Sequence, residues 1–109
     1  MEVARGDFVT VVLPGDYGKP RPALVIQSDL FDAHPSVTFL PETNELRDAP
    51  LYRIAVTPSS TNGLHRPSQV RVDKPQTVAR TKFGTTIGRL DNEAMLGVNR
   101  ALAAFLGFA

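Results

Sequence analysis

The sequence contains no cysteine, so it has neither a disulfide framework nor a cysteine-ligated metal site. Its two histidines, His34 and His65, are far apart in the chain, and a zinc site is therefore not expected. The opening residues MEVARGDF lack the apolar core of a signal peptide, and no apolar run approaches the roughly 20 residues that a membrane helix needs. We expect a cytoplasmic protein that requires no metal or other cofactor.

Several familiar catalytic motifs are also missing. The chain has no GxSxG elbow, no Walker loop and no HExxH helix. Ser59 and Ser60 precede His65 in one loop, but no acidic residue stands in order with them. A serine hydrolase is therefore disfavoured, and the candidate chemistry has to come from the charged residues.

The 109 residues carry a net charge of only +1, and a hydrophobic content of 42% suffices for one core. We expect a single domain over residues 1–109. The charge is unevenly distributed, because residues 65–90 hold six Lys and Arg residues against one acid, Asp73. Such a basic segment is typical of a surface that binds a polyanion, although an ordinary solvated face has the same composition.

Short β-branched and apolar runs alternate with turn residues along most of the chain. They predict strands at 7–13, 22–28, 37–40, 51–57 and 68–73, with shorter ones at 76–80 and 85–88. An N-cap at Asp91, an apolar stripe from Met95 to Phe105 and a stop at Gly107 predict a closing helix. Residues 58–67 are expected to form a loop that is mobile or ordered by a partner. The pattern favours a small, mainly antiparallel barrel with the helix on one side.

Arg21 stands between two prolines where a core strand is expected to begin, in the stretch YGKPRPALVIQ. A residue before proline is restricted to extended conformations, so Lys19 and Arg21 are both restrained. Since neither proline can donate a backbone hydrogen bond, the segment belongs at the mouth of a strand. A guanidinium fixed there presents a planar fork of donors suited to phosphate, although a surface arginine at a loop junction is the simpler interpretation.

Three further polar residues accompany expected strands. Thr43 follows the third strand, while Arg71 and Asp73 share one face of the fifth, with Cα atoms roughly 6.5–7 Å apart. If they converge with Arg21, a carboxylate can accept a 2′-hydroxyl proton, guanidiniums can stabilise phosphate charge, and a hydroxyl can position a phosphate oxygen. Such a set can cleave RNA by transesterification without a metal. The alternative for Arg71 and Asp73 is an exposed ion pair of little energetic value.

The stretch RGDFVTVVLPGDYGKPRPALVIQSDLF resembles the opening of the MazF/PemK toxins, which begin with Gly-Asp, a strand, a loop, Arg-Pro and an apolar strand. Thr43, in Leu-Pro-Glu-Thr, is similar to the family threonine, and SQVRVDKP resembles the strand that carries Arg-x-Asp in PemK-type members. The resemblance covers nearly the whole chain. Two departures are that the loop before Arg21 lacks the family's Glu-Gln and that Lys74 replaces a usual glutamine.

The resemblance implies a small SH3-like barrel of the CcdB/MazF type. It also implies a ribosome-independent mRNA endoribonuclease toxin that inhibits translation and growth, forms a homodimer and is neutralised by a cognate antitoxin. Arg21 and Thr43 match the catalytic pair, and Arg71 and Asp73 match an acid–base pair in which the two roles stay open. The residues expected to contact RNA are Tyr17, Lys19, His65, Arg66, Lys74, Arg80 and Lys82.

Two other functions remain open at this point. The related CcdB-type toxins inhibit DNA gyrase and end in Trp-Gly-Ile, whereas this chain ends in Leu-Gly-Phe-Ala and contains no tryptophan. A non-catalytic barrel that binds nucleic acid or protein is the third interpretation. Cleavage of a long RNA in the presence of EDTA distinguishes the nuclease from both.

Overall fold

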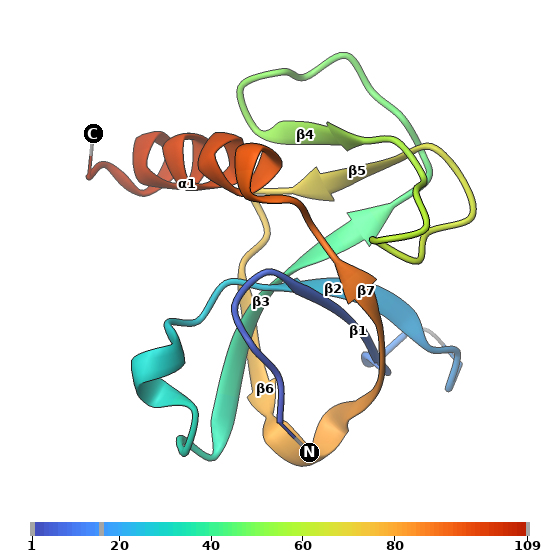
Figure 1. Ribbon diagram of the computed structural model, residues 1–109, viewed down its shortest axis with the longest axis vertical. Coiled ribbons are helices and arrows are strands. Elements are labelled where there is room, and N and C mark those ends of the chain that lie inside the picture. The colour runs from blue at the N-terminus through green and yellow to red at the C-terminus, as the bar shows by residue number, and fades with distance from the viewer. Residues whose placement is uncertain (1, 16, 109) are drawn as a thin grey trace.

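The computed structural model describes residues 2–15 and 17–108 and shows seven strands followed by one α-helix (Figure 1). The strands are β1 (Asp7–Val11), β2 (Arg21–Val25), β3 (Ser36–Thr43), β4 (Arg53–Val56), β5 (Ser68–Arg71), β6 (Gln76–Ala79) and β7 (Phe83–Arg89). The helix α1 spans Asn92–Leu106, and two short 3-10 turns are η1 (Asp29–Phe31) and η2 (Arg80–Lys82). Every pairing among these strands is antiparallel, which confirms the predicted antiparallel barrel with a C-terminal helix.

β3 organises the sheet because it pairs with two different strands along one edge. Its first half, Ser36 to Phe39, pairs with β6, whereas Glu42 and Thr43 at its end pair with β5. Its other edge pairs with β2, which gives the order β4-β5-β3-β2-β1-β7. Pro41 falls where β3 changes partner, so its missing N–H costs no pairing with β5 or β6. Figure 1 shows β5 and β6 extending from opposite ends of β3.

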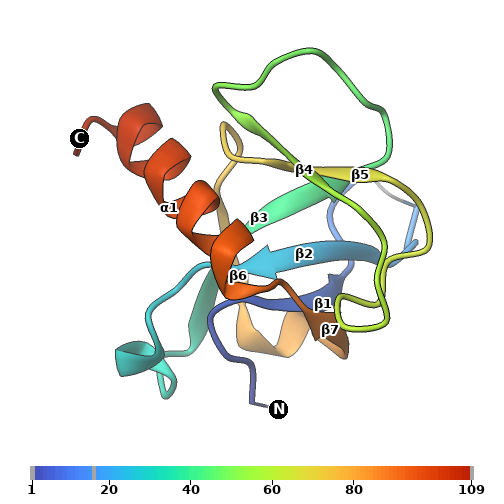
Figure 2. The same cartoon turned by 45° about the horizontal axis from the view of Figure 1, so that its top comes forward.

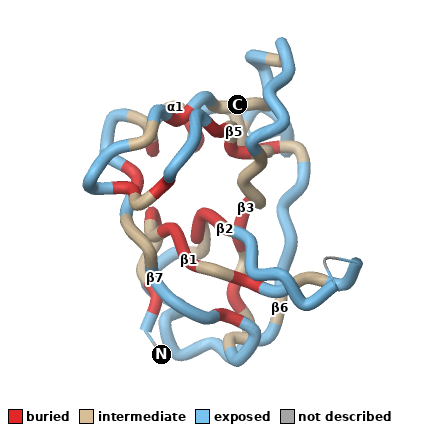
Figure 3. The backbone as a smooth tube through the Cα atoms, turned by 90° about the vertical axis from the view of Figure 1, so that its right-hand side faces the viewer, coloured by how far each residue is buried: buried red, intermediate tan, exposed pale blue. Residues whose placement is uncertain are grey.

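Two apolar clusters fill opposite faces of the central strands. Alternation along β2 sends Leu24 into the cluster beneath α1, and Ala23 and Val25 into the other. β3 divides in the same way, with Leu40 in the first cluster and Phe39 in the second. Figure 3 shows buried positions along β1, β2, β3 and β5, and the polar ends of these strands lie where this burial stops.

The observed strands differ from the predicted ones by a few residues at their ends. β2 begins at Arg21, and β3 continues through Pro41 to Thr43 instead of ending at residue 40. β5 ends at Arg71 because the Lys74 N–H donates to the Arg71 carbonyl at 3.2 Å and turns the chain. Asp73 therefore lies in a turn and not on the strand that the sequence predicts.

The helix α1 has the termini that the sequence predicts. The Asp91 side chain accepts a hydrogen bond from the Ala94 N–H at 2.7 Å, and Gly107 ends the helix with a φ of 87°. Both caps thus follow from local sequence alone.

No helix in the described part of the chain has the length and apolarity to cross a membrane.

The apolar stripe of α1 is only partly covered by the sheet. Met95 and Val98 are buried in the first cluster, whereas Phe105 is 50% exposed and Phe108, beyond the helix, is 81% exposed. Figure 2 shows the C-terminal end of α1 projecting away from the strands. The first half of the helix therefore contributes to the core, and its end leaves apolar surface uncovered.

The connection between β4 and β5 is anchored by the buried side chain of Asn62. Its Oδ1 accepts hydrogen bonds from the N–H groups of Ser59 at 3.1 Å and Leu64 at 3.0 Å. Its Nδ2 donates to the Thr57 carbonyl at 2.9 Å. The loop predicted at 58–67 is present, and the buried Asn62 side chain supplies the hydrogen-bond partners that a strand would otherwise give its backbone.

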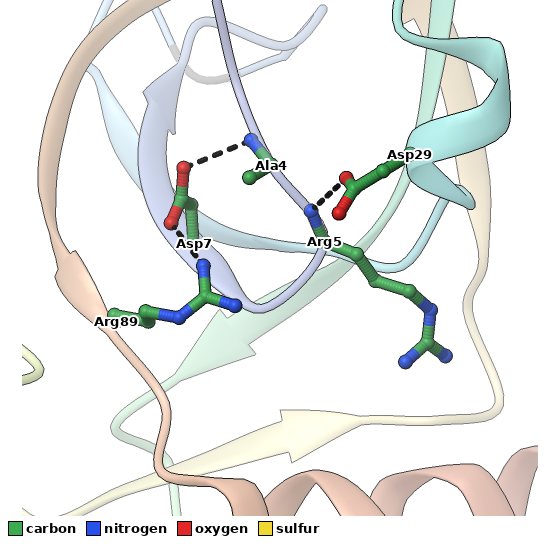
Figure 4. A network of polar contacts seen from close by, with 5 residues as sticks. All are labelled: Ala4, Arg5, Asp7, Asp29 and Arg89. Carbon is green, nitrogen blue, oxygen red and sulfur yellow. Dashed lines mark hydrogen bonds and ion pairs between the residues drawn. The ribbon is translucent and has the colours of Figure 1, made fainter.

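A polar network ties β1 to the rest of the molecule (Figure 4). Asp7 forms an ion pair with Arg89 of β7 at 2.8 Å, and the Arg5 N–H donates to the Asp29 carboxylate at 2.8 Å. The Arg5 guanidinium also donates to the Asn99 side chain of α1 at 2.6 Å. Arg89 is therefore engaged in holding β1 and β7 together.

Candidate active site

The ends of β2 and β3 and the strand β5 carry polar side chains on one face of the sheet. Ala23 and Pro41 form the last pair of the ladder between β2 and β3, and continuing this register by two residues brings Arg21 opposite Thr43. Thr43 pairs in turn with Gln69. Opposite residues of antiparallel strands share a face, with Cβ atoms about 4.5–5.5 Å apart. Arg21, Thr43 and Gln69 thus form one row across three strands.

Thr43 keeps a hydrogen-bond donor available at the end of β3. Its Oγ1 accepts a hydrogen bond from the Glu45 N–H at 3.1 Å, which leaves the hydroxyl proton for another acceptor. Arg21 is exposed at the first position of β2, as its two flanking prolines predict. A phosphate above this row can therefore accept hydrogen bonds from a hydroxyl and from a guanidinium.

Arg71 lies one step along the sheet from this row. It is two residues from Gln69 on β5, so its Cβ is about 7–8 Å from that of Thr43 on the diagonal. No ion pair joins Arg71 to Asp73 in the part of the chain that the structure describes, so the interpretation as an ion pair is wrong. Instead, Arg71 Nε and Asp73 Oδ1 are each buried without a hydrogen-bond partner. Such atoms are costly to leave unpaired, which favours a ligand at this place.

Asp73 is further from the row than Arg71 is. It is four positions beyond Gln69, a distance of about 13 Å if the strand continued, and the turn after β5 intervenes. The register therefore brings Arg21, Thr43 and Arg71 close together, and it leaves Asp73 further from Arg21 and Thr43.

Sequence reasoning missed Glu42, which directly precedes Thr43 on β3. Burial raises the pKa of the Glu42 carboxyl, while the Ser68 hydroxyl and the Arg21 charge act in the opposite direction. The carboxyl thus lies within electrostatic reach of Arg21 and holds its proton more strongly than an exposed glutamate does. Carboxyls of this kind are frequent among general acids and bases. The only signal in the sequence is that Glu42 stands next to Thr43. This signal is hidden if Pro41 is taken as the end of the third strand, because Glu42 then falls outside it.

Four of the residues expected to contact RNA flank the row. Tyr17 and Lys19 are exposed in the loop that leads into Arg21, and Tyr17 has a φ of 53°. His65 and Arg66 are exposed just before β5, whose first residues lie beside the end of β3. These four side chains are therefore placed at the same end of the sheet as Arg21.

The other three are spread more widely. Lys74 is exposed in the turn after β5. Arg80 and Lys82 follow β6, which pairs with the start of β3, so they lie at the far end of that strand, about 23 Å from Thr43. Arg80 also donates to the His34 carbonyl at 2.9 Å. The structure does not bring Arg80 and Lys82 to the row. The reason is that β3 pairs with β6 along its first half and with β5 only at its end.

Comparison with known proteins agrees with this fold. A family described as "PemK-like, MazF-like toxin of type II toxin-antitoxin system" matches residues 4–106. The chain is 46% identical over 106 residues to a probable endoribonuclease MazF of Mycolicibacterium smegmatis, with coverage of 96% of this chain and 97% of the relative.

Solved structures share the fold. An endoribonuclease in complex with its cognate antitoxin from Mycobacterial species has a TM-score of 0.84 at 24% identity, covering 98% of this chain and 97% of that one. A MazE–MazF complex from Deinococcus radiodurans has a TM-score of 0.81 at 18% identity, covering 98% and 97%. These likenesses confirm the expected MazF-type barrel. From the match of the family over residues 4–106 and from the relative of 46% identity, this chain belongs to the PemK-like, MazF-like toxins of type II toxin–antitoxin systems.

Proposed function

We propose that this toxin is an endoribonuclease that cuts single-stranded mRNA at the row formed by Arg21 and Thr43. The observation that carries the proposal is the register of β2 and β3, which, continued for two residues beyond Ala23 and Pro41, brings Arg21 opposite Thr43. Both side chains can donate hydrogen bonds to one phosphodiester. The identity of 46% to a probable endoribonuclease supports the assignment.

In the proposed reaction, the 2′-oxygen of a ribose attacks the adjacent phosphorus. The bond between the 2′-oxygen and phosphorus forms while the bond between phosphorus and the 5′-oxygen breaks, which yields a 2′,3′-cyclic phosphate and a 5′-hydroxyl. Arg21 stabilises the charge that builds on the phosphate oxygens, and Thr43 positions one of them. The reaction needs a base for the 2′-hydroxyl proton and an acid for the leaving 5′-oxygen, but no metal ion.

Two carboxyl groups are candidates for the base. Asp73 follows Arg71 and has a buried oxygen without a partner. Glu42 lies within electrostatic reach of Arg21, and burial raises its pKa, although its side chain is on the face of β3 opposite to Thr43, with Val70 and Ser68. A carboxylate with a raised pKa accepts a proton more readily than an ordinary carboxylate. Single substitutions at these two positions separate the candidates.

We also propose that the toxin forms a homodimer and binds a cognate antitoxin. Phe105, Leu106 and Phe108 expose apolar surface at the end of α1, which a second copy can cover. A specific interface buries at least about 1,200 Å² in total. Similar solved structures include toxins in complex with an antitoxin, which supports the second partner.

Incubation of the purified protein with a long RNA in EDTA tests the activity. The wild type should give discrete fragments, and Arg21→Ala should give none while its Tm stays within a few degrees, as for a surface change. Arg21→Lys should also cleave poorly, since lysine cannot form the bidentate fork. Arg100→Gln is the matched control, because it removes an exposed arginine from α1 and should cleave like the wild type. Full cleavage by Arg21→Ala would refute the proposed site.

A further inference from the structure

Two arginines lie side by side next to the candidate active site. Arg53 of β4 pairs directly with Arg71 of β5, and the two side chains share the sheet face that also carries Thr43 and Gln69. Like charges directly opposite each other across a sheet are destabilising. The fold thus holds together two guanidiniums that repel each other.

The position of Arg53 is set by hydrogen bonds and not by a charge partner. Its Nη1 donates to Gln69 Oε1 at 3.0 Å and to the Glu45 carbonyl at 3.1 Å. Gln69 is itself fixed, because its amide accepts from the Arg47 N–H at 3.1 Å and donates to the Arg47 carbonyl at 2.8 Å. The loop after Thr43 and the side chains of β5 therefore hold the Arg53 guanidinium in one orientation.

Both guanidiniums have donors left for a ligand. Arg53 uses only Nη1 in these contacts, so three of its five N–H groups remain. Arg71 Nε is buried and has no hydrogen-bond partner. Among the residues that the structure describes, no carboxylate forms an ion pair with either arginine. An anion between them would relieve the repulsion and satisfy the buried donor at the same time.

We propose that Arg53 and Arg71 together bind a phosphodiester of the RNA next to the one that is cleaved, which makes Arg53 a substrate-binding residue. The inference rests on the proposed function. The row of Arg21 and Thr43 supports RNA as the source of the anion, because Arg71 is one diagonal step from Thr43 and Arg53 is one strand further on. A chain of phosphates that runs across the strands would meet both sites in succession.

The test uses a single-stranded oligonucleotide with 2′-O-methyl groups throughout, which cannot undergo transesterification. Its Kd for the wild type, Arg53→Gln, Arg53→Lys and Arg100→Gln is measured by fluorescence anisotropy at several salt concentrations. Log Kobs falls as log salt rises, and the loss of one phosphate contact in Arg53→Gln should make this slope shallower by about 0.7. We expect Arg53→Gln to bind roughly ten- to a hundredfold more weakly and to raise KM for unmodified RNA more than it lowers kcat, since one hydrogen bond to a charged group is worth roughly that much.

Arg53→Lys should keep the wild-type salt slope, because it keeps the charge. Arg100→Gln should match the wild type in slope and in Kd, which shows that the effect is not a general loss of positive charge. A purely structural role for Arg53 predicts a lower Tm with an unchanged slope. If the wild type cleaves unmodified RNA but Arg53→Gln keeps the wild-type slope and Kd, the subsite is refuted while the proposed function stands. If the wild type cleaves no RNA, the proposed function itself fails.

Discussion

The loop between β4 and β5 should depend on the side chain of Asn62. This side chain is 5% exposed and makes three hydrogen bonds to backbone groups, those of Ser59, Leu64 and Thr57. Asn62→Ala removes all three partners at once and leaves two N–H groups and one carbonyl unpaired. The loop that carries His65 towards the end of β3 would lose its anchor.

The cost follows from the number of bonds. Each hydrogen bond contributes about 1 kcal/mol net, and a group left unsatisfied in the interior costs more, so Asn62→Ala should lower the free energy of unfolding by about 3 kcal/mol. That is a large share of the roughly 5–15 kcal/mol of a typical domain. The Tm should fall by roughly 12 °C or more at about 4 °C per kcal/mol.

Urea denaturation measures the change, with the m-value as a check that the unfolded states are comparable. Ser59→Ala is the matched control in the same loop. It removes one hydrogen bond, from the Asn62 N–H to the Ser59 hydroxyl at 3.1 Å, and should cost about 1 kcal/mol or less. A loss below about 1 kcal/mol in Asn62→Ala would refute the reasoning, and so would fast amide exchange at Leu64 in the wild type.

The remaining predictions concern stability, catalysis and assembly. Burial raises the pKa of Glu42, so its contribution to stability is present below about pH 4 and is lost as the pH rises through the raised folded value. Glu42→Gln should therefore melt at a higher temperature than the wild type at pH 7, with the difference closing in acid; equal melting at both would show that the carboxyl is not buried in solution. Of the variants Glu42→Gln and Asp73→Asn, the one that removes the base should cleave RNA roughly 10²–10⁴-fold more slowly while it still binds RNA. A loss of cleavage rate below about tenfold excludes the substituted residue as the base. Gly63→Ala should be destabilising because the new Cβ would overlap the Ile87 carbonyl, and a Tm like that of the wild type would contradict the close packing of this loop on β7. In sedimentation at micromolar concentration the wild type should have the mass of a dimer and Phe105→Glu that of a monomer, since a charge opposes burial of this surface; a monomeric wild type would contradict the proposed interface.

Features set by local sequence could be predicted well. The two prolines around Arg21 place it at the start of a strand, and β2 begins there. Asp91 and Gly107 cap the closing helix as predicted, because a cap depends on a few neighbouring residues. The alternation that buries Val70 and Val72 was also evident, since the side-chain period of a strand is fixed.

Features set by long-range pairing could not be predicted. The change of partner along β3 depends on β5 and β6, more than 20 residues later, and it separates Arg80 from Thr43 although the basic segment looks continuous in the sequence. The same change explains why Pro41 is tolerated within β3, and therefore why Glu42 belongs to the strand. The repulsive pairing of Arg53 with Arg71 also appears only once the register of β4 and β5 is known.

The termini of the RNA fragments test the central claim most directly. A long RNA is cleaved in EDTA, the fragments are analysed by mass spectrometry, and an RNA of the same sequence with 2′-O-methyl groups throughout serves as the control. Attack by the 2′-oxygen at the row of Arg21 and Thr43 predicts 2′,3′-cyclic phosphates and 5′-hydroxyls from the wild type, and no cleavage of the methylated RNA or by Arg21→Ala. Fragments with 3′-hydroxyls and 5′-phosphates, or cleavage of the methylated RNA, would contradict the account.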